Sequence, residues 1–121
     1  MVADGIPRLD VLLLGMGEDG HTASLFPGTE ALHETSRLVL GYTVEKLNAP
    51  RITLTFPVIN NAGKVLFLVS GEGKAAILRE LFQGESPELR YPAAMVAPRN
   101  GLLYWHLDRE AASMIHVAVS E

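Results

Sequence analysis

Asp19 and His21 are the residues of this sequence whose types and spacing best fit a catalytic pair. An imidazole with its ordinary pKa of about 6.5 can take a proton from water near neutral pH. A carboxylate two positions earlier can orient that imidazole or hold the water itself. We therefore predict that His21 is a general base assisted by Asp19. The plainer alternatives are a histidine that only packs and an aspartate that only caps a helix.

The pair lies in a glycine-rich turn, GMGEDGH at 15–21, which follows an apolar run at 9–14. That run predicts a strand buried on both faces of a parallel sheet. Ligands of such sheets bind at the carboxyl ends of the strands, where glycines let backbone N–H groups approach an anion. We expect Gly15, Gly17 and Gly20 to bind the substrate.

The letters GMGEDG also fit the dinucleotide-binding pattern GxGxxG. In that fold the third glycine lies in a helix that continues for several turns. Here Pro27 and Gly28 end any helix after about two turns. Neither Glu34 nor Glu45 follows a clear second strand, as the ribose-binding acid would. A dinucleotide-binding oxidoreductase domain is therefore the weaker alternative.

Arg51 and Lys74 are the expected anion binders, since each lies at the end of a predicted strand. A guanidinium can bind phosphate through two parallel hydrogen bonds, whereas an ammonium acts as a point charge. The segment SGEGKA at 70–75 resembles a truncated phosphate loop, but Ala75 stands where a Mg²⁺-binding Ser or Thr would be needed. No metal and no cofactor are implied.

Strands that alternate with helices predict an α/β fold with a mainly parallel sheet. Residues 1–8 are expected to be an exposed lead-in without a regular element, because Gly5 and Pro7 interrupt it. Asp108 is expected to cap a brief helix. Strands are predicted at 9–14, 37–44, 51–56, 64–69, 93–97 and 102–107, helices at 21–26, 30–34, 58–62, 74–83 and 109–113, and a strand or ordered tail at 114–119.

The composition bounds the function further. The 121 residues suit a single domain, and the formal net charge of −4 argues against nucleic acid and against a polybasic membrane surface. There is no cysteine, so disulfides and thiolate metal sites are excluded. The apolar run near the N-terminus is too short for a signal or a membrane span, which favours a cytoplasmic protein. We interpret Lys46 and Lys64 as solvated surface charges.

Four blocks carry a resemblance to a known family: GMGEDGHTASLFPGT at 15–29, PRITLTFPVINNA at 50–62, SGEGKA at 70–75 and WHLDREAA at 105–112. In this order they resemble the glucosamine-6-phosphate deaminase/6-phosphogluconolactonase family. The deaminases follow the histidine with a segment holding an acidic residue, whereas SLFPG here is similar to the lactonases. The resemblance implies a three-layer α/β/α sandwich of the sugar-phosphate isomerase/deaminase/CoA transferase-like superfold, of which residues 1–121 would be the second half.

The resemblance also implies an activity, the hydrolysis of 6-phospho-D-glucono-1,5-lactone to 6-phosphogluconate in the oxidative pentose phosphate pathway. His21 and Asp19 would be catalytic, and Arg51 and Lys74 would contact the substrate phosphate. The only implied partner is this small phosphorylated lactone. The alternative is a sugar-phosphate binding module or fragment without turnover. We expect the chain alone to be inactive and to associate through an exposed sheet edge or apolar surface at 9–14.

Overall fold

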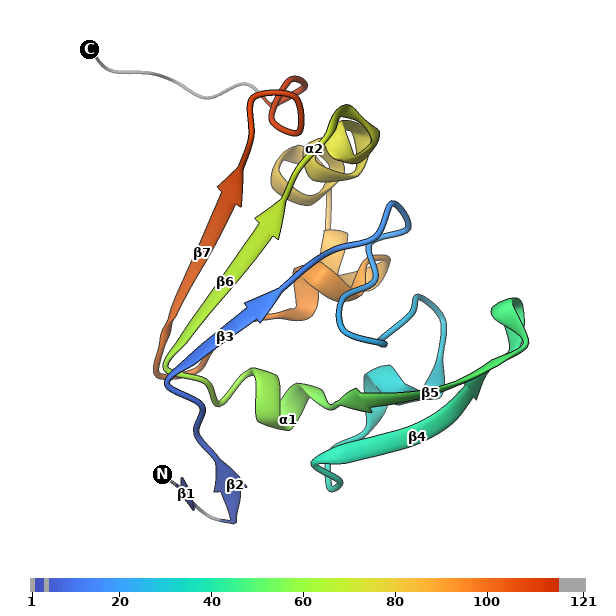
Figure 1. Cartoon of the computed structure of the whole chain (residues 1–121), viewed down its shortest axis with the longest axis vertical. Helices are drawn as coiled ribbons and strands as arrows, with labels where there is room; N and C mark the ends of the chain where they lie inside the picture. The colour runs from blue at the N-terminus through green and yellow to red at the C-terminus, as the bar shows by residue number, and fades with distance from the viewer. Residues whose placement is uncertain (1, 4, 116–121) are drawn as a thin grey trace.

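A parallel three-stranded sheet forms the centre of the computed structural model, which describes residues 2–3 and 5–115. Its strands lie in the order β3 (Val11–Leu14), β6 (Lys64–Val69) and β7 (Leu102–Leu107), as Figure 1 shows. All three run in the same direction, with Leu14 beside Phe67 and Phe67 beside Trp105. The predicted α/β class and the strands predicted at 64–69 and 102–107 are thereby confirmed.

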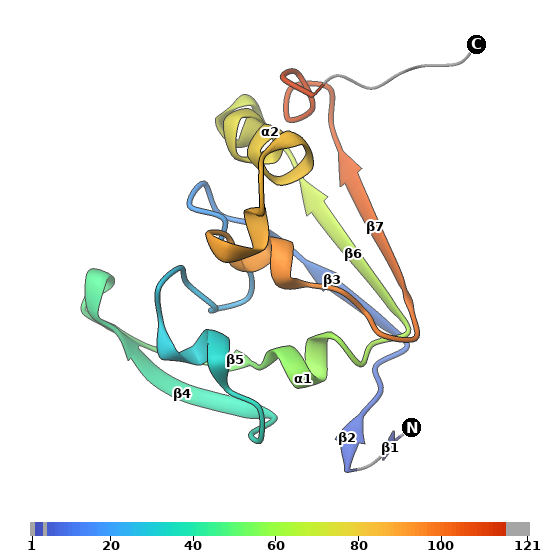
Figure 2. The same ribbon diagram turned by 180° about the vertical axis from the view of Figure 1, so that it is seen from behind.

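One face of this sheet carries the core. The alternating side chains Val65, Phe67 and Val69 are at most 4% exposed, as expected for the inward face of a strand. Helix α2 (Ala75–Gln83), preceded by the 3₁₀ turn η3 (Glu72–Lys74), lies on this side together with the segment 84–96 (Figures 1 and 2). Hydrophobic burial on this face therefore holds the layer to the sheet.

The opposite face of the sheet is apolar and uncovered by the described residues. Val11 and Leu13 of β3 are 54% and 60% exposed, and Leu68 and Leu102 are each 52% exposed. The expectation that strand 9–14 is buried on both faces is therefore wrong for this chain, because β3 lies at the edge of the described sheet and one layer alone packs on it. The expected exposed apolar surface along this strand is confirmed.

Between β3 and β6 the chain forms an antiparallel hairpin that is separate from the parallel sheet. The hairpin consists of β4 (Val39–Val44), the 3₁₀ turn η2 (Glu45–Leu47) and β5 (Ala49–Leu54). It leads into the short helix α1 (Phe56–Ile59), whose first turn holds a proline as expected. Strands were predicted in both places, but their pairing with each other, outside the parallel sheet, was not. Sequence patterns of this length do not distinguish the two kinds of pairing.

Several short elements differ from expectation. Strands β1 (Val2–Ala3) and β2 (Ile6–Pro7) pair in the expected lead-in, and the predicted strand 93–97 is instead the 3₁₀ turn η5 (Pro92–Met95). The Ala93 N–H donates to the Gly20 carbonyl at 2.9 Å, which fixes this apolar run against the glycine-rich turn. Residues 109–114 form turns rather than a helix, and 116–119 lie outside the described residues. The remaining elements are two 3₁₀ turns, η1 (Glu30–His33) before β4 and η4 (Pro87–Leu89) after α2.

Candidate active site

The carboxyl ends of the three parallel strands meet at one edge of the sheet, and the loops that leave them contact one another. The Lys74 ammonium, after β6, donates to the Met16 carbonyl after β3 at 2.5 Å. The Asp108 carboxylate, after β7, accepts the N–H groups of Gly71 at 3.1 Å and Ala111 at 2.8 Å. Asp108 thus caps a turn as expected, although no helix follows it. This edge is where a parallel sheet places its ligands.

Asp19 and His21 form a hydrogen-bonded pair in the loop after β3. His21 Nδ1 lies 2.5 Å from Asp19 Oδ1, and the His21 backbone N–H donates to the same oxygen at 3.0 Å. A carboxylate at Nδ1 selects the tautomer that leaves the lone pair on Nε2. Nε2 has no hydrogen-bond partner among the described residues, and the side chain is 31% exposed. The imidazole is therefore oriented and open to solvent, as a general base requires.

Asp19 is held in its ionised form. Partial burial pushes the pKa of this carboxyl upward, but the hydrogen bonds from the His21 backbone and ring, and the charge of that ring, outweigh burial and leave the pKa below its ordinary value. A carboxylate that stays ionised can stabilise the imidazolium formed when His21 takes a proton. The ring also stacks on Phe26, with 4.3 Å between the ring centroids, which restricts its rotation.

The glycines of this loop make room for the pair. A Cβ on Gly17 would lie 2.1 Å from Cε1 and 2.2 Å from Nδ1 of His21, so no other residue fits beside the ring. Gly20 has φ of +85°, and Tyr91 packs against it. The N–H groups of Gly17 and Gly20 donate within the loop, to His21 O and Gly17 O. Substrate binding by Gly15, Gly17 and Gly20 stays a prediction.

The predicted helix at 21–26 is wrong, and a tight turn replaces it. Thr22 and Leu25 form an isolated antiparallel bridge, and Ala23 between them has φ of +51°. The Thr22 hydroxyl donates to the Gly15 carbonyl at 2.8 Å, which draws the chain back toward β3. Because no helix follows Gly20, the pyrophosphate site of a dinucleotide-binding fold is not formed, and that alternative is excluded on geometry.

The hairpin β4–β5 presents Arg51 on the face that contacts this turn. Thr53 Oγ1 accepts the Ser24 N–H at 3.1 Å, and the Tyr42 hydroxyl donates to the Ser24 carbonyl at 2.6 Å. Arg51 pairs with Tyr42 and lies two residues before Thr53, so all three share one face. Arg51 lines a shallow depression with Tyr42. Lys74 reaches the loop from the other side, through Met16. Anion binding by either cation stays a prediction.

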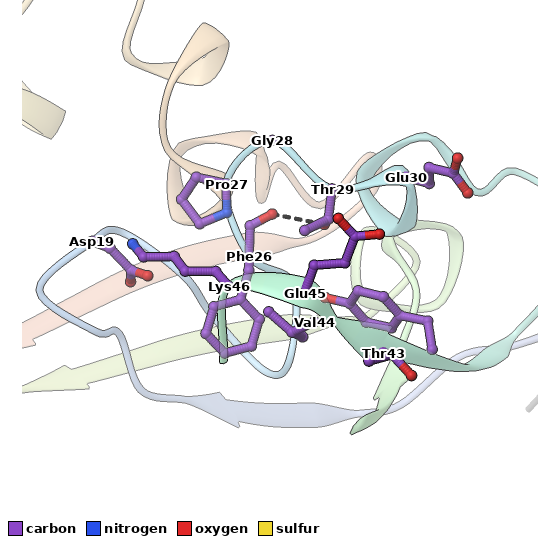
Figure 3. Close-up of a pocket in the computed structure, with 11 residues that line it drawn as sticks. Asp19, Phe26, Pro27, Gly28, Thr29, Glu30, Thr43, Val44, Glu45 and Lys46 are labelled. Carbon is purple, nitrogen blue, oxygen red and sulfur yellow. Dashed lines mark hydrogen bonds between the residues drawn. The ribbon is translucent and has the colours of Figure 1, made fainter. Parts of the chain in front are cut away.

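A cavity of about 620 Å³ lies beside Asp19, between the segment 26–30 and the turn of the hairpin. Figure 3 shows the Lys46 amine pointing toward the Asp19 carboxylate across this cavity. Lys46 is exposed, which agrees with its interpretation as a solvated surface charge, and it also lines this cavity. Its position here depends on a hairpin that pairs residues far from Asp19, and no local signal in the sequence indicates it. No group of three or more His, Asp or Glu side chains converges within the described residues to hold a metal ion.

Residues 1–105 match the family described as glucosamine-6-phosphate isomerases/6-phosphogluconolactonase. The chain belongs to this family. The 6-phosphogluconolactonase of Rattus norvegicus is 46% identical over 115 residues, which are 94% of this chain and 44% of that protein. The 6-phosphogluconolactonase of a Nostoc strain is 47% identical over 92% of this chain and 45% of its own length. The chain thus spans less than half the length of these lactonase relatives.

Solved structures of the family agree with the fold. The 6-phosphogluconolactonase of Trypanosoma brucei superimposes with a TM-score of 0.78 at 30% identity, over 91% of this chain and 43% of that one. A monomeric glucosamine-6-phosphate deaminase superimposes with a TM-score of 0.68 at 26% identity, over 87% of this chain and 47% of that one. The family's fold thus serves proteins named for two activities.

Within its described part the chain has no helix with the length and apolar character to cross a bilayer.

Proposed function

We propose that this chain carries the catalytic pair of a 6-phosphogluconolactonase, which hydrolyses 6-phospho-D-glucono-1,5-lactone to 6-phosphogluconate in the oxidative pentose phosphate pathway. The observation that carries the proposal is the 2.5 Å contact between His21 Nδ1 and Asp19 Oδ1, with Nε2 left open. Membership of the family and the lactonase names of the most similar relatives support it. The segment SLFPG after the turn favours the lactonases over the deaminases.

The chemistry needs one water molecule and no covalent intermediate. His21 Nε2 takes a proton as the water oxygen attacks the carbonyl carbon, and the carbonyl electron pair moves to oxygen. The tetrahedral intermediate then collapses, the bond to the ring oxygen breaks, and that oxygen takes the proton from the imidazolium. Asp19 stabilises the imidazolium throughout. Since the N–H groups of Gly17 and Gly20 are used within the loop, we expect a cation to meet the oxyanion.

Replacing the base tests the proposal directly. In the protein that carries these residues, His21→Ala should lower lactone hydrolysis by about 10²- to 10⁴-fold, because the water loses its proton acceptor. Rates are measured above the spontaneous hydrolysis of the lactone. The matched control is His33→Ala, an exposed histidine in η1. Parent-like turnover in His21→Ala would reject the assignment, and tight product binding without turnover in the parent would indicate a sugar-phosphate binding module instead.

We propose that Arg51 and Lys74 bind the phosphate and so position the carbonyl against His21. Arg51→Gln and Lys74→Gln should each raise the KM for the phosphorylated lactone far more than for the dephosphorylated lactone. Lys64→Gln is the control, because that lysine is exposed at the start of β6. Equal losses on both substrates would show that neither residue acts through the phosphate.

We also propose that residues 1–121 act as part of a longer lactonase domain and that the chain alone is inactive and self-associates. The apolar open face, with Val11, Leu13, Leu68 and Leu102 about half exposed, and the free edge of β3 support this. Sedimentation of the chain should show association, and Leu13→Lys should reduce it. A monodisperse chain with full activity would contradict both parts.

We propose the cytoplasm as the location of the protein. The absence of cysteine from the sequence is compatible with a reducing compartment. A rice relative is named chloroplastic, so fractionation of source cells is the deciding measurement. Recovery of the protein in an organelle fraction would contradict the proposal.

A further inference from the structure

Side chains of the hairpin hold both polar backbone groups of Ser24. Its N–H donates to Thr53 Oγ1 in β5 at 3.1 Å, and its carbonyl accepts the Tyr42 hydroxyl from β4 at 2.6 Å. The Thr53 hydroxyl donates to the Leu54 carbonyl at 2.8 Å, so its lone pairs remain to accept the Ser24 N–H. Thr53 is 4% exposed, and Tyr42 is half-buried. Each strand of the hairpin thus contributes one hydrogen bond to the same residue.

Ser24 belongs to the turn that ends the catalytic loop after β3. It lies between Thr22 and Leu25, whose bridge closes the turn, and two residues before Phe26, which stacks on the His21 ring. Among the described residues, no other hydrogen bond joins the hairpin to this loop. The two bonds to Ser24 therefore determine how the hairpin lies against the loop.

The same strands carry Arg51. It pairs with Tyr42 across the hairpin and precedes Thr53 by two residues, so all three side chains share the face that meets the loop. Within the described part of the chain, neither strand of the hairpin pairs with a strand of the central sheet. The place of Arg51 relative to the loop consequently depends on side-chain contacts rather than on a continuous sheet.

We propose that Tyr42 and Thr53 are positioning residues that hold the hairpin against the catalytic loop. By doing so they set the distance between the Arg51 guanidinium and the His21 imidazole. A lactone whose phosphate is bound at Arg51 then presents its carbonyl to His21 at a fixed separation. Both residues act through the Ser24 backbone rather than on the substrate. The inference rests on the proposed roles of Arg51 and His21, but the contact with Ser24 can be measured without turnover.

Tyr42→Phe tests the inference, because it removes the hydroxyl and keeps the ring. In the protein that carries these residues, kcat/KM for the phosphorylated lactone should fall about 10-fold, a part of the roughly 10²-fold that a misplacement of about 1 Å can cost. The value for the dephosphorylated lactone, which Arg51 does not hold, should stay near that of the parent. Thr53→Val should act in the same way. Equal losses on both substrates would overturn the inference.

Thr55→Val is the matched control for Thr53→Val. Thr55 is fully buried two residues farther along the chain, and its hydroxyl donates to the carbonyls of Arg37 and Leu38 instead of contacting the loop. Its replacement should lower the stability but leave the ratio of the two kcat/KM values as in the parent. If Thr55→Val changed that ratio as much as Thr53→Val does, the effect would be one of stability, and the inference would fail.

A double variant shows whether Tyr42 acts through Arg51. Once Arg51→Gln has removed the guanidinium, adding Tyr42→Phe should cause no further loss on the phosphorylated lactone, because the separation that Tyr42 sets no longer matters. The same fold-loss from Tyr42→Phe in both backgrounds would overturn the inference.

Hydrogen exchange separates this inference from the proposed function. In Thr53→Val the Ser24 amide should exchange faster than in the parent, because its hydrogen bond is lost. Unchanged exchange would overturn the inference at its structural step. Faster exchange together with equal losses on both lactones in Arg51→Gln would support the hold on Ser24 and reject Arg51 as a phosphate ligand.

Discussion

Two glycine-rich turns leave the same edge of the sheet, and their glycines are required for different reasons. In the turn after β3, Gly17 is needed for space, since a Cβ there would overlap the His21 ring. In the turn after β6, Gly71 has open space around it but a φ of +97° and ψ of 150°, a backbone conformation that is almost confined to glycine. The first requirement concerns a catalytic side chain and the second the path of the chain.

This difference shows why glycine patterns are weak evidence for a ligand. GMGEDG fits a dinucleotide fingerprint and SGEGK resembles a phosphate loop, yet neither turn arranges its glycine N–H groups as those motifs do. Gly17 donates to His21 O, and Gly71 donates to the Asp108 carboxylate. We therefore expect replacement of Gly17 in the first turn to affect activity and replacement of Gly71 in the second to affect stability.

The largest effect is expected from Gly17→Ala. The added Cβ forces the His21 ring to move, and a displacement of about 1 Å at a reacting group can cost about 10²-fold in rate. The measurement is kcat/KM for lactone hydrolysis. Gly41→Ala in β4 is the control, because a Cβ there would meet only a backbone oxygen at 4.0 Å. Parent-like activity in Gly17→Ala would show that the His21 ring does not need the space that this glycine leaves.

A smaller effect, on stability, is expected from Gly71→Ala. Alanine in this backbone conformation should destabilise the fold by about 1 to 3 kcal/mol, measured as the free energy of unfolding in urea. Activity should fall much less than in Gly17→Ala. If Gly71→Ala instead abolished activity at unchanged stability, the contrast between the turns would be lost.

Asp108→Ala should weaken the second turn by about 1 kcal/mol, because the N–H groups of Gly71 and Ala111 lose their acceptor at an exposed site. Asp108→Asn keeps one oxygen acceptor and should lose less. Denaturation curves of the two variants, compared with the parent, measure the difference. Equal losses in both would show that the carboxylate charge, rather than the hydrogen bond, holds the turn.

The smallest effect is a pH dependence of stability from Asp19. Its pKa is lowered in the folded protein, so its stabilising contribution is present above the ordinary carboxyl pKa and is lost as pH falls through the lowered value. Asp19→Asn should remove this contribution. The free energy of unfolding of the variant should therefore fall less than that of the parent between about pH 5 and pH 3, the range in which ordinary carboxyl groups titrate. An identical acid profile in parent and variant would contradict the lowered pKa.

The sequence predicted the parts of this structure that local patterns determine. The apolar run at 64–69 and the amphipathic run at 74–83 became β6 and α2. Asp19 and His21 meet because a single residue of the glycine turn, Gly20, separates them. The helix expected at 21–26 did not form, since the contact between Thr22 and the Gly15 carbonyl, which belongs to tertiary structure, outweighs its weak helical pattern.

Non-local pairing explains what could not be predicted. The antiparallel hairpin brings Lys46 to the wall of the cavity that Asp19 also lines, and no spacing in the sequence indicates this. The strand predicted at 93–97 does not form, because the Ala93 N–H donates its hydrogen bond to the Gly20 carbonyl instead of to a neighbouring strand. The apolar run at 9–14 predicted burial on both faces, and nothing in that run could indicate that one face is uncovered by the described residues.

Trp105 gives this protein an optical probe of its own sheet. It is the single tryptophan of the sequence, and it lies in β7, an edge strand, stacked on Phe67 with 3.9 Å between centroids and met edge-on by Phe82. Release of β7 from the sheet would expose the indole to water and move its emission to longer wavelength. The loop after β3 contains no tryptophan. Fluorescence can therefore separate variants that open the sheet from variants that disturb only the catalytic loop.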